Sequence, residues 1–199
     1  MGDKNEKYIH YINFDFQFYY HLMCKKSDTS STTTTTEVEG TWLTNCFQSG
    51  DYYHIHSATV TGTDVVVKYE WHTDSGCSTD YVMWEDTYDS LSIGDEITFS
   101  DGTKGHQFTL NIVNLKLTPQ IASVVSSLNT DNSCGYSDWA LNTAKDYTGK
   151  NCSSIAYPVA NTSIQGLYNL VGNNLFLGTL NTTGSYPTEV STTITYVKQ

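Results

Sequence analysis

The stretch Gly40-Thr41-Trp42-Leu43-Thr44-Asn45-Cys46 opens the part of the chain that is patterned like a folded domain. From Val38 onward, short segments rich in Val, Ile, Thr, Tyr and Trp alternate with turns rich in Gly, Asn and Asp. This pattern is typical of a β-sandwich or β-barrel. We therefore predict one domain over residues 38–199, preceded by a Ser/Thr-rich tether over 24–37 and a leader-like segment over 1–23.

The charge of the chain limits its partners. Its 199 residues carry a formal net charge of -11, and all of its basic residues are lysines. Nucleic acid is not an expected partner, because no basic surface is available to neutralise phosphates. An acidic region without EF-hand spacing is interpreted as a solvated face rather than a calcium site. It comprises Asp80, Glu85, Asp86, Asp89, Asp95, Glu96 and Asp101.

A predicted hairpin connects residues 52–61 to residues 64–72 through Gly62-Thr63. In the second strand Val65, Val67, Tyr69 and Trp71 alternate with polar residues, which predicts an inward and an outward face. A two-residue loop pairs His56 with Tyr69 and His54 with Trp71, so that both histidines point inward. A one-residue bulge would instead send them to solvent.

Further strands are predicted along the rest of the chain. They cover residues 81–88, 96–99, 107–117, a segment from Trp139 to a turn at 148–149, 166–170 paired with 175–179, and a closing strand over 191–197. A change of hydrophobic phase predicts a bulge near Ile112. Residues 120–128 are expected to form a short helix or a loop over one mouth. The eight to ten strands predict an all-β protein with a single antiparallel barrel.

Four well-separated cysteines indicate two disulfides of an exported protein, with buried free thiols as the alternative. Three pairings of Cys46, Cys77, Cys134 and Cys152 are possible. We favour nearest-neighbour pairing, Cys46 with Cys77 and Cys134 with Cys152. Each such bond closes a moderate loop and stabilises the fold by roughly 3 kcal/mol in the chain-entropy model.

The N-terminal segment does not match a standard leader. Residues 1–23 are rich in Phe and Tyr, but Asp15, Gln17 and two histidines interrupt any continuous apolar run. The segment is therefore either leader-like or the product of a wrongly assigned start codon. Cys24 directly precedes the tether and is a candidate for lipidation, which would anchor the protein to a membrane.

Two sets of residues carry a family resemblance. Gly40 and Trp42, with Lys198 placed to pack over the indole, resemble the lipocalin-like (calycin) barrels. The ordered set Gly40 to Cys46, 74–77, 134–139, 145–152, 172–175 and the terminal Tyr-x-Lys-Gln resembles uncharacterised bacterial lipocalin-like secreted proteins or lipoproteins. The resemblance implies a barrel and export to the periplasm, outer membrane or cell surface. It implies no catalytic residue and no particular ligand.

The candidate ligand-binding residues are His54, His56, Tyr69 and Trp71, which offer hydrogen-bonding groups and an aromatic wall. A metal is not expected, because a site needs a third ligand and His72 falls on the opposite face. No cofactor or catalytic motif is predicted. We expect a monomeric, non-catalytic module that binds a small or extended ligand. The alternatives are a surface interaction or structural lipoprotein with a filled barrel, which contacts a protein or glycan, and a hydrolase without a recognisable motif.

Overall fold

The computed structural model describes residues 36–99, 102 and 104–199. The predicted leader, Cys24 and most of the tether lie outside these residues, and only Thr36 and Glu37 of the tether are included. Glu37 accepts a hydrogen bond from the Tyr168 hydroxyl at 2.7 Å. No helix within the described part of the chain is long and apolar enough to cross a membrane.

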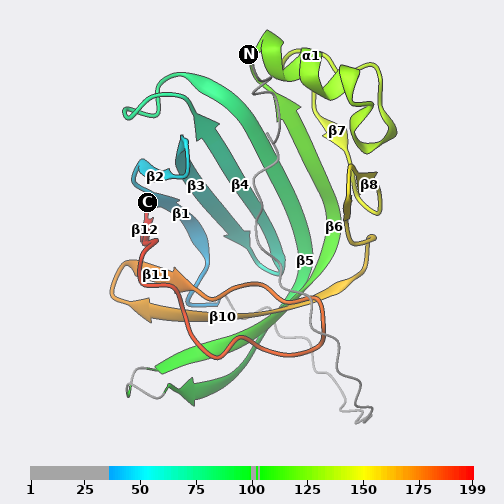
Figure 1. Ribbon diagram of the computed structural model, residues 1–199. Helices are drawn as coiled ribbons and strands as arrows, with labels where there is room; N and C mark the ends of the chain where they lie inside the picture. The colour runs from blue at the N-terminus through cyan, green and yellow to red at the C-terminus, as the bar shows by residue number, and fades with distance from the viewer. Residues whose placement is uncertain (1–35, 100–101, 103) are drawn as a thin grey trace. The chain divides into compact units, whose positions relative to one another are not determined.

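The described domain is almost entirely β-structure (Figure 1). Its first six strands are β1 (Gly40–Thr44), β2 (Phe47–Ser49), β3 (Tyr52–Thr61), β4 (Asp64–His72), β5 (Asp80–Thr98) and β6 (Lys104–Pro119). Then follow helix α1 (Ala122–Thr130), a 3-10 turn η1 (Ser133–Gly135), and the short strands β7 (Lys145–Asp146), β8 (Asn151–Cys152) and β9 (Ile155–Ala156). The last strands are β10 (Ser163–Val171), β11 (Asn174–Leu177) and β12 (Tyr196–Lys198).

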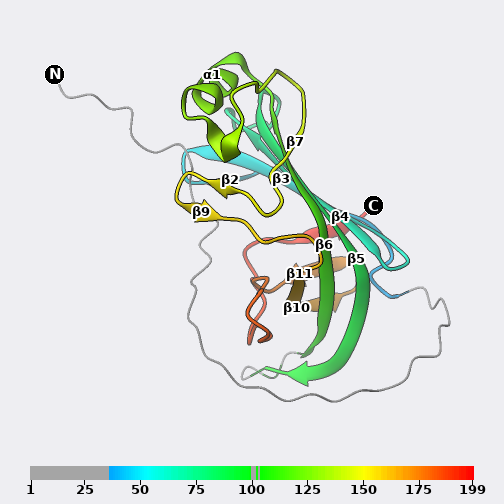
Figure 2. The ribbon, with the colours of Figure 1, turned by 90° about the vertical axis from the view of Figure 1, so that its right-hand side faces the viewer.

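Eight strands close into an antiparallel barrel, as the sequence predicts. The order β1-β12-β11-β10-β6-β5-β4-β3 returns to its start, because β3 also pairs with β1. Gly40 lies opposite Val60, and Trp42 lies opposite both Ala58 and Lys198. Strand β2 pairs only with β3, and β7 pairs only with β6. Strands β3 to β6 therefore extend beyond the closed ring (Figures 1 and 2).

The two predicted hairpin registers are confirmed. In the β3–β4 hairpin His56 lies opposite Tyr69 and His54 lies opposite Trp71. The same faces carry the buried side chains Ala58 and Val67, so the two histidines point inward. In the β10–β11 hairpin Tyr168 lies opposite Leu177. Each hairpin has a two-residue loop whose first residue is a glycine, Gly62 or Gly172. Both glycines adopt a positive φ of 61°, which such a tight turn requires, and the short loop fixes the register.

The predicted bulge near Ile112 is also confirmed. Thr87 pairs with Asn114 and Tyr88 pairs with Ile112, which leaves Val113 as an extra residue in β6. Ile112 is 1% exposed, whereas Val113 is 38% exposed. The bulge therefore shifts the inward set of β6 from even to odd positions, and this shift explains the change of hydrophobic phase in the sequence.

Three strand predictions are wrong in their boundaries. Residues 81–88 and 96–99 belong to one strand, β5, which continues across two register irregularities between Asp89 and Glu96. The polar residues of that interval suggest a turn, and Ser90 does adopt a positive φ of 56°, but pairing with the long strand β6 resumes on both sides of each irregularity and carries the strand through. The closing strand is only Tyr196–Lys198; before it Ser191 makes a single backbone bond to Leu177, and its hydroxyl bonds locally to Thr193.

The predicted strand that begins at Trp139 is absent from the described structure. Trp139 is buried, but its backbone N–H donates to the Asn129 side chain at 2.7 Å and its indole N–H donates to Ser133 at 3.2 Å. Leu141 is 50% exposed, and Asn142 adopts a positive φ of 54°. Trp139 therefore packs below α1 and η1, and only β7 is extended in this segment. Residues 122–130 form a helix, one of the two forms predicted for residues 120–128.

One half of the barrel interior is apolar. We call it the apolar half, and it comprises Val38, Trp42, Val60, Val65, Phe108, Leu110 and Ile112. Trp42 is fully buried, its indole N–H donates to the Val38 carbonyl at 2.8 Å, and the Lys198 ammonium lies 5.2 Å from the ring centroid. The predicted packing of Lys198 over Trp42 is confirmed. Cation–π contacts at such partly exposed sites contribute about 0.5–1 kcal/mol.

The predicted disulfides are confirmed. Cys46 is bonded to Cys77, and Cys134 is bonded to Cys152. The first bond links the β1–β2 connection to the loop after β4. The second is buried in the insert between β6 and β10. Two disulfides indicate that the chain folds in an oxidising, extracellular type of environment.

Candidate ligand-binding site

The second half of the barrel interior combines aromatic rings with polar groups. We call it the polar half, and it comprises His54, His56, Tyr69, Trp71, Trp84, Asp86, Tyr147, Tyr157 and Tyr196. Most of it is built from β3, β4 and β5, where these strands extend beyond the closed ring, while Tyr196 lies on β12 and Tyr147 and Tyr157 come from the segment between β6 and β10. All four residues proposed from the sequence, His54, His56, Tyr69 and Trp71, lie together on this inward surface.

The two histidines are neutral groups that present hydrogen-bonding atoms. Nε2 of His54 donates to the Ser49 carbonyl at 3.2 Å, and because a carbonyl only accepts, this contact places the proton on Nε2. Nδ1 of His56 is hydrogen-bonded to the Tyr196 hydroxyl at 3.3 Å. Burial lowers the pKa of both rings, that of His56 to about 4; His72 lowers the pKa of His54 further, and His54 lowers that of His56.

An aromatic wall lies beside the histidines. The Trp71 ring packs against Trp84 at 4.6 Å, against His54 at 4.7 Å and against Tyr52 at 5.3 Å between ring centroids. On the neighbouring pair, His56 meets Tyr69 edge to face at 4.8 Å. Aromatic pairs of this geometry add stability beyond the area that they bury.

Asp86 corrects one prediction. The sequence places it in a solvated acidic face, but it alternates with Trp84 and Tyr88 on the inward side of β5. Its carboxylate accepts hydrogen bonds from the Tyr88 hydroxyl at 3.1 Å and the Tyr147 hydroxyl at 3.5 Å. Burial raises the pKa of Asp86 to about 7, and the two hydrogen bonds oppose that rise.

Glu85 points to the opposite side of the strand and fits the prediction of a solvated face. Its carboxylate oxygens lie 3.3 Å from the Lys68 ammonium and 3.7 Å from the Lys116 ammonium, on the outer surface of the barrel. Adjacent residues of one strand therefore have opposite environments. The alternation of side chains across a strand is the cause.

The insert between β6 and β10 supplies two further phenols. Tyr147 is anchored because its backbone N–H donates to the Leu115 carbonyl at 2.9 Å, and the Thr148 hydroxyl accepts from the Leu115 N–H at 2.8 Å. Its ring meets Tyr157 edge to face at 4.6 Å. The Cys134–Cys152 bond fixes the same insert. These contacts hold Tyr147 over Asp86.

Several side chains of the polar half keep part of their surface exposed to solvent. Tyr69, Trp84, Asp86 and Tyr157 are of intermediate exposure, although they face inward. In the apolar half, by contrast, Val60, Val65 and Ile112 are buried. These inward-facing side chains of the polar half therefore keep some accessible surface, as a binding surface requires.

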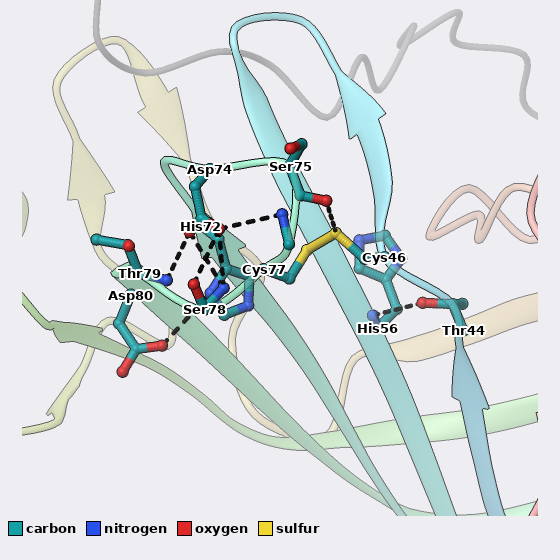
Figure 3. The surroundings of a disulfide bond; sticks show 11 residues. Thr44, Cys46, His56, His72, Asp74, Ser75, Cys77, Ser78, Thr79 and Asp80 are labelled. Atoms are coloured by element: carbon teal, nitrogen blue, oxygen red, sulfur yellow. Dashed lines mark hydrogen bonds and ion pairs between the residues drawn. A yellow bond between two sulfur atoms is a disulfide. The ribbon is translucent and has the colours of Figure 1, made fainter.

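His72 lies away from this site, as the register predicts. It is buried on the outer side of the β4 end below the loop 73–79, with its Nδ1 3.4 Å from the Asp80 carboxylate (Figure 3). The loop is organised by Asp74, whose carboxylate accepts from the backbone N–H groups of Gly76, Ser78 and Thr79. Hydrogen bonds from Ser78 and Thr79 are the main cause of a lowered Asp74 pKa of about 2. This loop has a structural role.

Metal-ligand clusters are not found in the described structure: no three His, Cys, Asp or Glu side chains converge there to hold an ion.

Two hollows lie outside the polar half. One, of about 300 Å³, is bordered by Glu37, Glu96, Lys104 and His106. The other, of about 1000 Å³, lies between the end of the β5–β6 hairpin and the segment 186–192.

Comparison with known proteins adds no identification. No protein-family model matches the chain, and no curated protein matches it.

Sequence reasoning found the β3–β4 part of the site but missed Asp86, Tyr147, Tyr157 and Tyr196. Asp86 was detectable, because it continues the inward alternation of Trp84 and Tyr88. Tyr147 and Tyr157 lie in irregular segments without periodicity, so that only the tertiary structure brings them to Asp86.

Proposed function

We propose that the protein is a non-catalytic binding module that takes a small ligand against the polar half of its barrel. The observation that supports this most directly is the set of inward-facing polar and aromatic side chains that remain partly exposed to solvent, above all Tyr69, Trp84 and Asp86. Ligand sites commonly combine an apolar aromatic lining with a few convergent polar groups. The neutral histidines and the phenols supply those groups here.

The wider setting is part of the same proposal. We place the protein among exported lipocalin-like bacterial proteins, monomeric and without a nucleic-acid partner, with a lipid on Cys24 as an anchor. The two disulfides support export, because such bonds persist in oxidising compartments. The contact of Lys198 with Trp42 supports the lipocalin-like assignment.

Binding is tested with the full chain produced in an oxidising compartment. The neutral fluorophore N-phenyl-1-naphthylamine is expected to gain fluorescence when it enters the polar half. Leu117→Trp, on the inward face opposite Trp84, should reduce this signal at least fivefold by filling the site. Lys116→Trp, on the outer face of the same strand, is the matched control and should leave it unchanged. Absence of any signal with the folded wild-type protein would overturn the proposal.

A second experiment looks for the natural ligand. Native mass spectrometry of protein purified from its host should show an adduct of small mass that is released on unfolding. The same spectra report the N-terminal segment, since an intact Met1 with unmodified Cys24 contradicts lipidation.

A further inference from the structure

Asp86 is a mostly buried, inward-facing carboxylate without a cationic partner among the described residues. Its only side-chain hydrogen bonds there come from the Tyr88 and Tyr147 hydroxyls. The lysines in the described ranges contact other groups: Lys68 and Lys116 contact Glu85, Lys104 contacts Glu96, Lys145 contacts Asp138, Lys150 lies over Tyr136, and Lys198 lies over Trp42. An uncompensated charge in such a site is costly.

Four phenol rings surround this carboxylate. Tyr69, Tyr88, Tyr147 and Tyr157 come from β4, β5 and the insert, and burial raises the pKa of each, with the Asp86 charge adding to the effect. The phenols therefore stay uncharged at neutral pH. Aromatic faces attract cations and do not attract anions, because the ring quadrupole is negative on its face.

A carboxylate beside several aromatic rings favours a positively charged guest. The carboxylate supplies the ion pair, and the rings supply cation–π contacts and cover the apolar part of the guest. Trp84, on the same face of β5 as Asp86, extends the aromatic surface toward Trp71. The net charge of -11 adds long-range attraction for cations.

We propose that the ligand of the polar half is a small organic cation, whose protonated amine pairs with Asp86 and whose body packs on the surrounding aromatic rings. This inference rests on the proposed function, because it names the class of ligand for the same surface. The rise of the Asp86 pKa to about 7 agrees with it, since the free site disfavours the charge that an amine would stabilise.

Three probes of nearly equal shape test the inference: 2-phenylethylamine, 2-phenylethanol and phenylacetate. Isothermal titration calorimetry at pH 7.5 should show the amine binding at least tenfold more tightly than the alcohol, with no detectable binding of the carboxylate. Asp86→Asn should abolish the preference for the amine. Glu85→Gln, the adjacent residue on the outer face, is the matched control and should retain it.

A second measurement does not depend on the folding of any variant. Between pH 5 and 8 the amine affinity of the wild-type protein should rise as Asp86 ionises, whereas the alcohol affinity should stay constant. The imidazole of His56 and the phenols around Asp86 keep their charge state in this range, because His56 has a pKa of about 4 and the pKa values of Tyr69, Tyr88, Tyr147, Tyr157 and Tyr196 are raised. Glu85 lies on the outer face, and its charge adds to the rise of the Asp86 pKa.

The outcomes separate this inference from the proposed function. Equal or tighter binding of the alcohol or the carboxylate overturns the cation assignment and leaves the binding module in place. An amine affinity that changes neither with pH nor in Asp86→Asn also overturns the cation assignment and leaves the binding module in place. If none of the three probes binds while N-phenyl-1-naphthylamine does, the cation assignment fails alone. If no probe binds to the folded protein, both proposals fail.

Discussion

The two halves of the barrel interior share strands β3 and β4 but differ in chemistry. Along β3 the inward series runs from His54 and His56 to Ala58 and Val60, and along β5 it runs from Trp84 and Asp86 to Tyr88. The apolar half lies within the closed ring, where side chains from all sides fill the core. The polar half lies mainly where β3, β4 and β5 extend beyond the ring and the segment between β6 and β10 covers them with Tyr147 and Tyr157. The comparison shows that the side of the strand on which a residue lies does not decide its role alone. Its position along the strand also determines whether an inward side chain packs in the core or is available to a ligand.

The largest expected effect is in the apolar half. Ile112→Ala should reduce the free energy of unfolding by about 2–5 kcal/mol, because Ile112 is 1% exposed and a truncated side chain leaves a cavity. Val113→Ala is the control, since Val113 is the exposed residue of the bulge and should change stability by less than about 0.5 kcal/mol. Urea denaturation followed by tryptophan fluorescence measures both. Equal losses would show that the bulge is placed wrongly.

The next effect concerns the bond that holds the insert. Replacing Cys134 and Cys152 together by serine should cost about 3 kcal/mol, because the bond closes a loop with a sequence separation of 18. The variant should also bind N-phenyl-1-naphthylamine less tightly, since Tyr147 loses its support. Replacing Cys46 and Cys77 should lower stability comparably but reduce probe binding less. Equal loss of binding in both variants would contradict the assigned role of the insert.

A smaller effect of opposite sign is expected in the polar half. The Asp86 pKa is raised from 3.8 to about 7 in the folded state, so the folded protein binds more protons than the unfolded chain between these values. Stability should therefore fall as pH rises from 4 to 7. Asp86→Asn removes this cost and should raise stability at pH 8 by about 1 kcal/mol or more, with little change at pH 4.

Thermal unfolding of both proteins between pH 4 and 8 measures this difference. A wild-type protein that gains stability as pH rises through this range, relative to Asp86→Asn, would contradict the buried environment of Asp86. Glu85→Gln keeps Asp86 but removes a charge that adds to the rise of its pKa, so its stability should still fall as pH rises, by less than that of the wild type.

The smallest effect is expected where the apolar half meets solvent. Lys198→Met should cost about 0.5–1 kcal/mol, because the methionine keeps the covering side chain but loses the charge over the Trp42 ring. Lys198→Arg should keep most of the stability. Chemical denaturation distinguishes the two variants, and identical values for methionine and wild type would assign the contact to packing alone.

The sequence predicted local features well where a short-range rule fixes them. Gly62-Thr63 fixed the β3–β4 register, and with it the inward position of His54 and His56. The phase change at Ile112 located the bulge. Residues without such rules were misplaced. Trp139 was assigned to a strand because its neighbours alternate, whereas Asn129 holds it beside the helix.

The sequence by itself determined the all-β class, the pairing of the β3–β4 hairpin and the face on which its aromatic and histidine residues lie. These follow from alternation and turn chemistry, which act between near neighbours. Only the tertiary structure decided the surroundings of Asp86. Its tyrosine partner at position 147 is 61 residues away, and strand pairing together with the Cys134–Cys152 bond brings the two together. Contacts over such a distance leave no periodicity in the sequence.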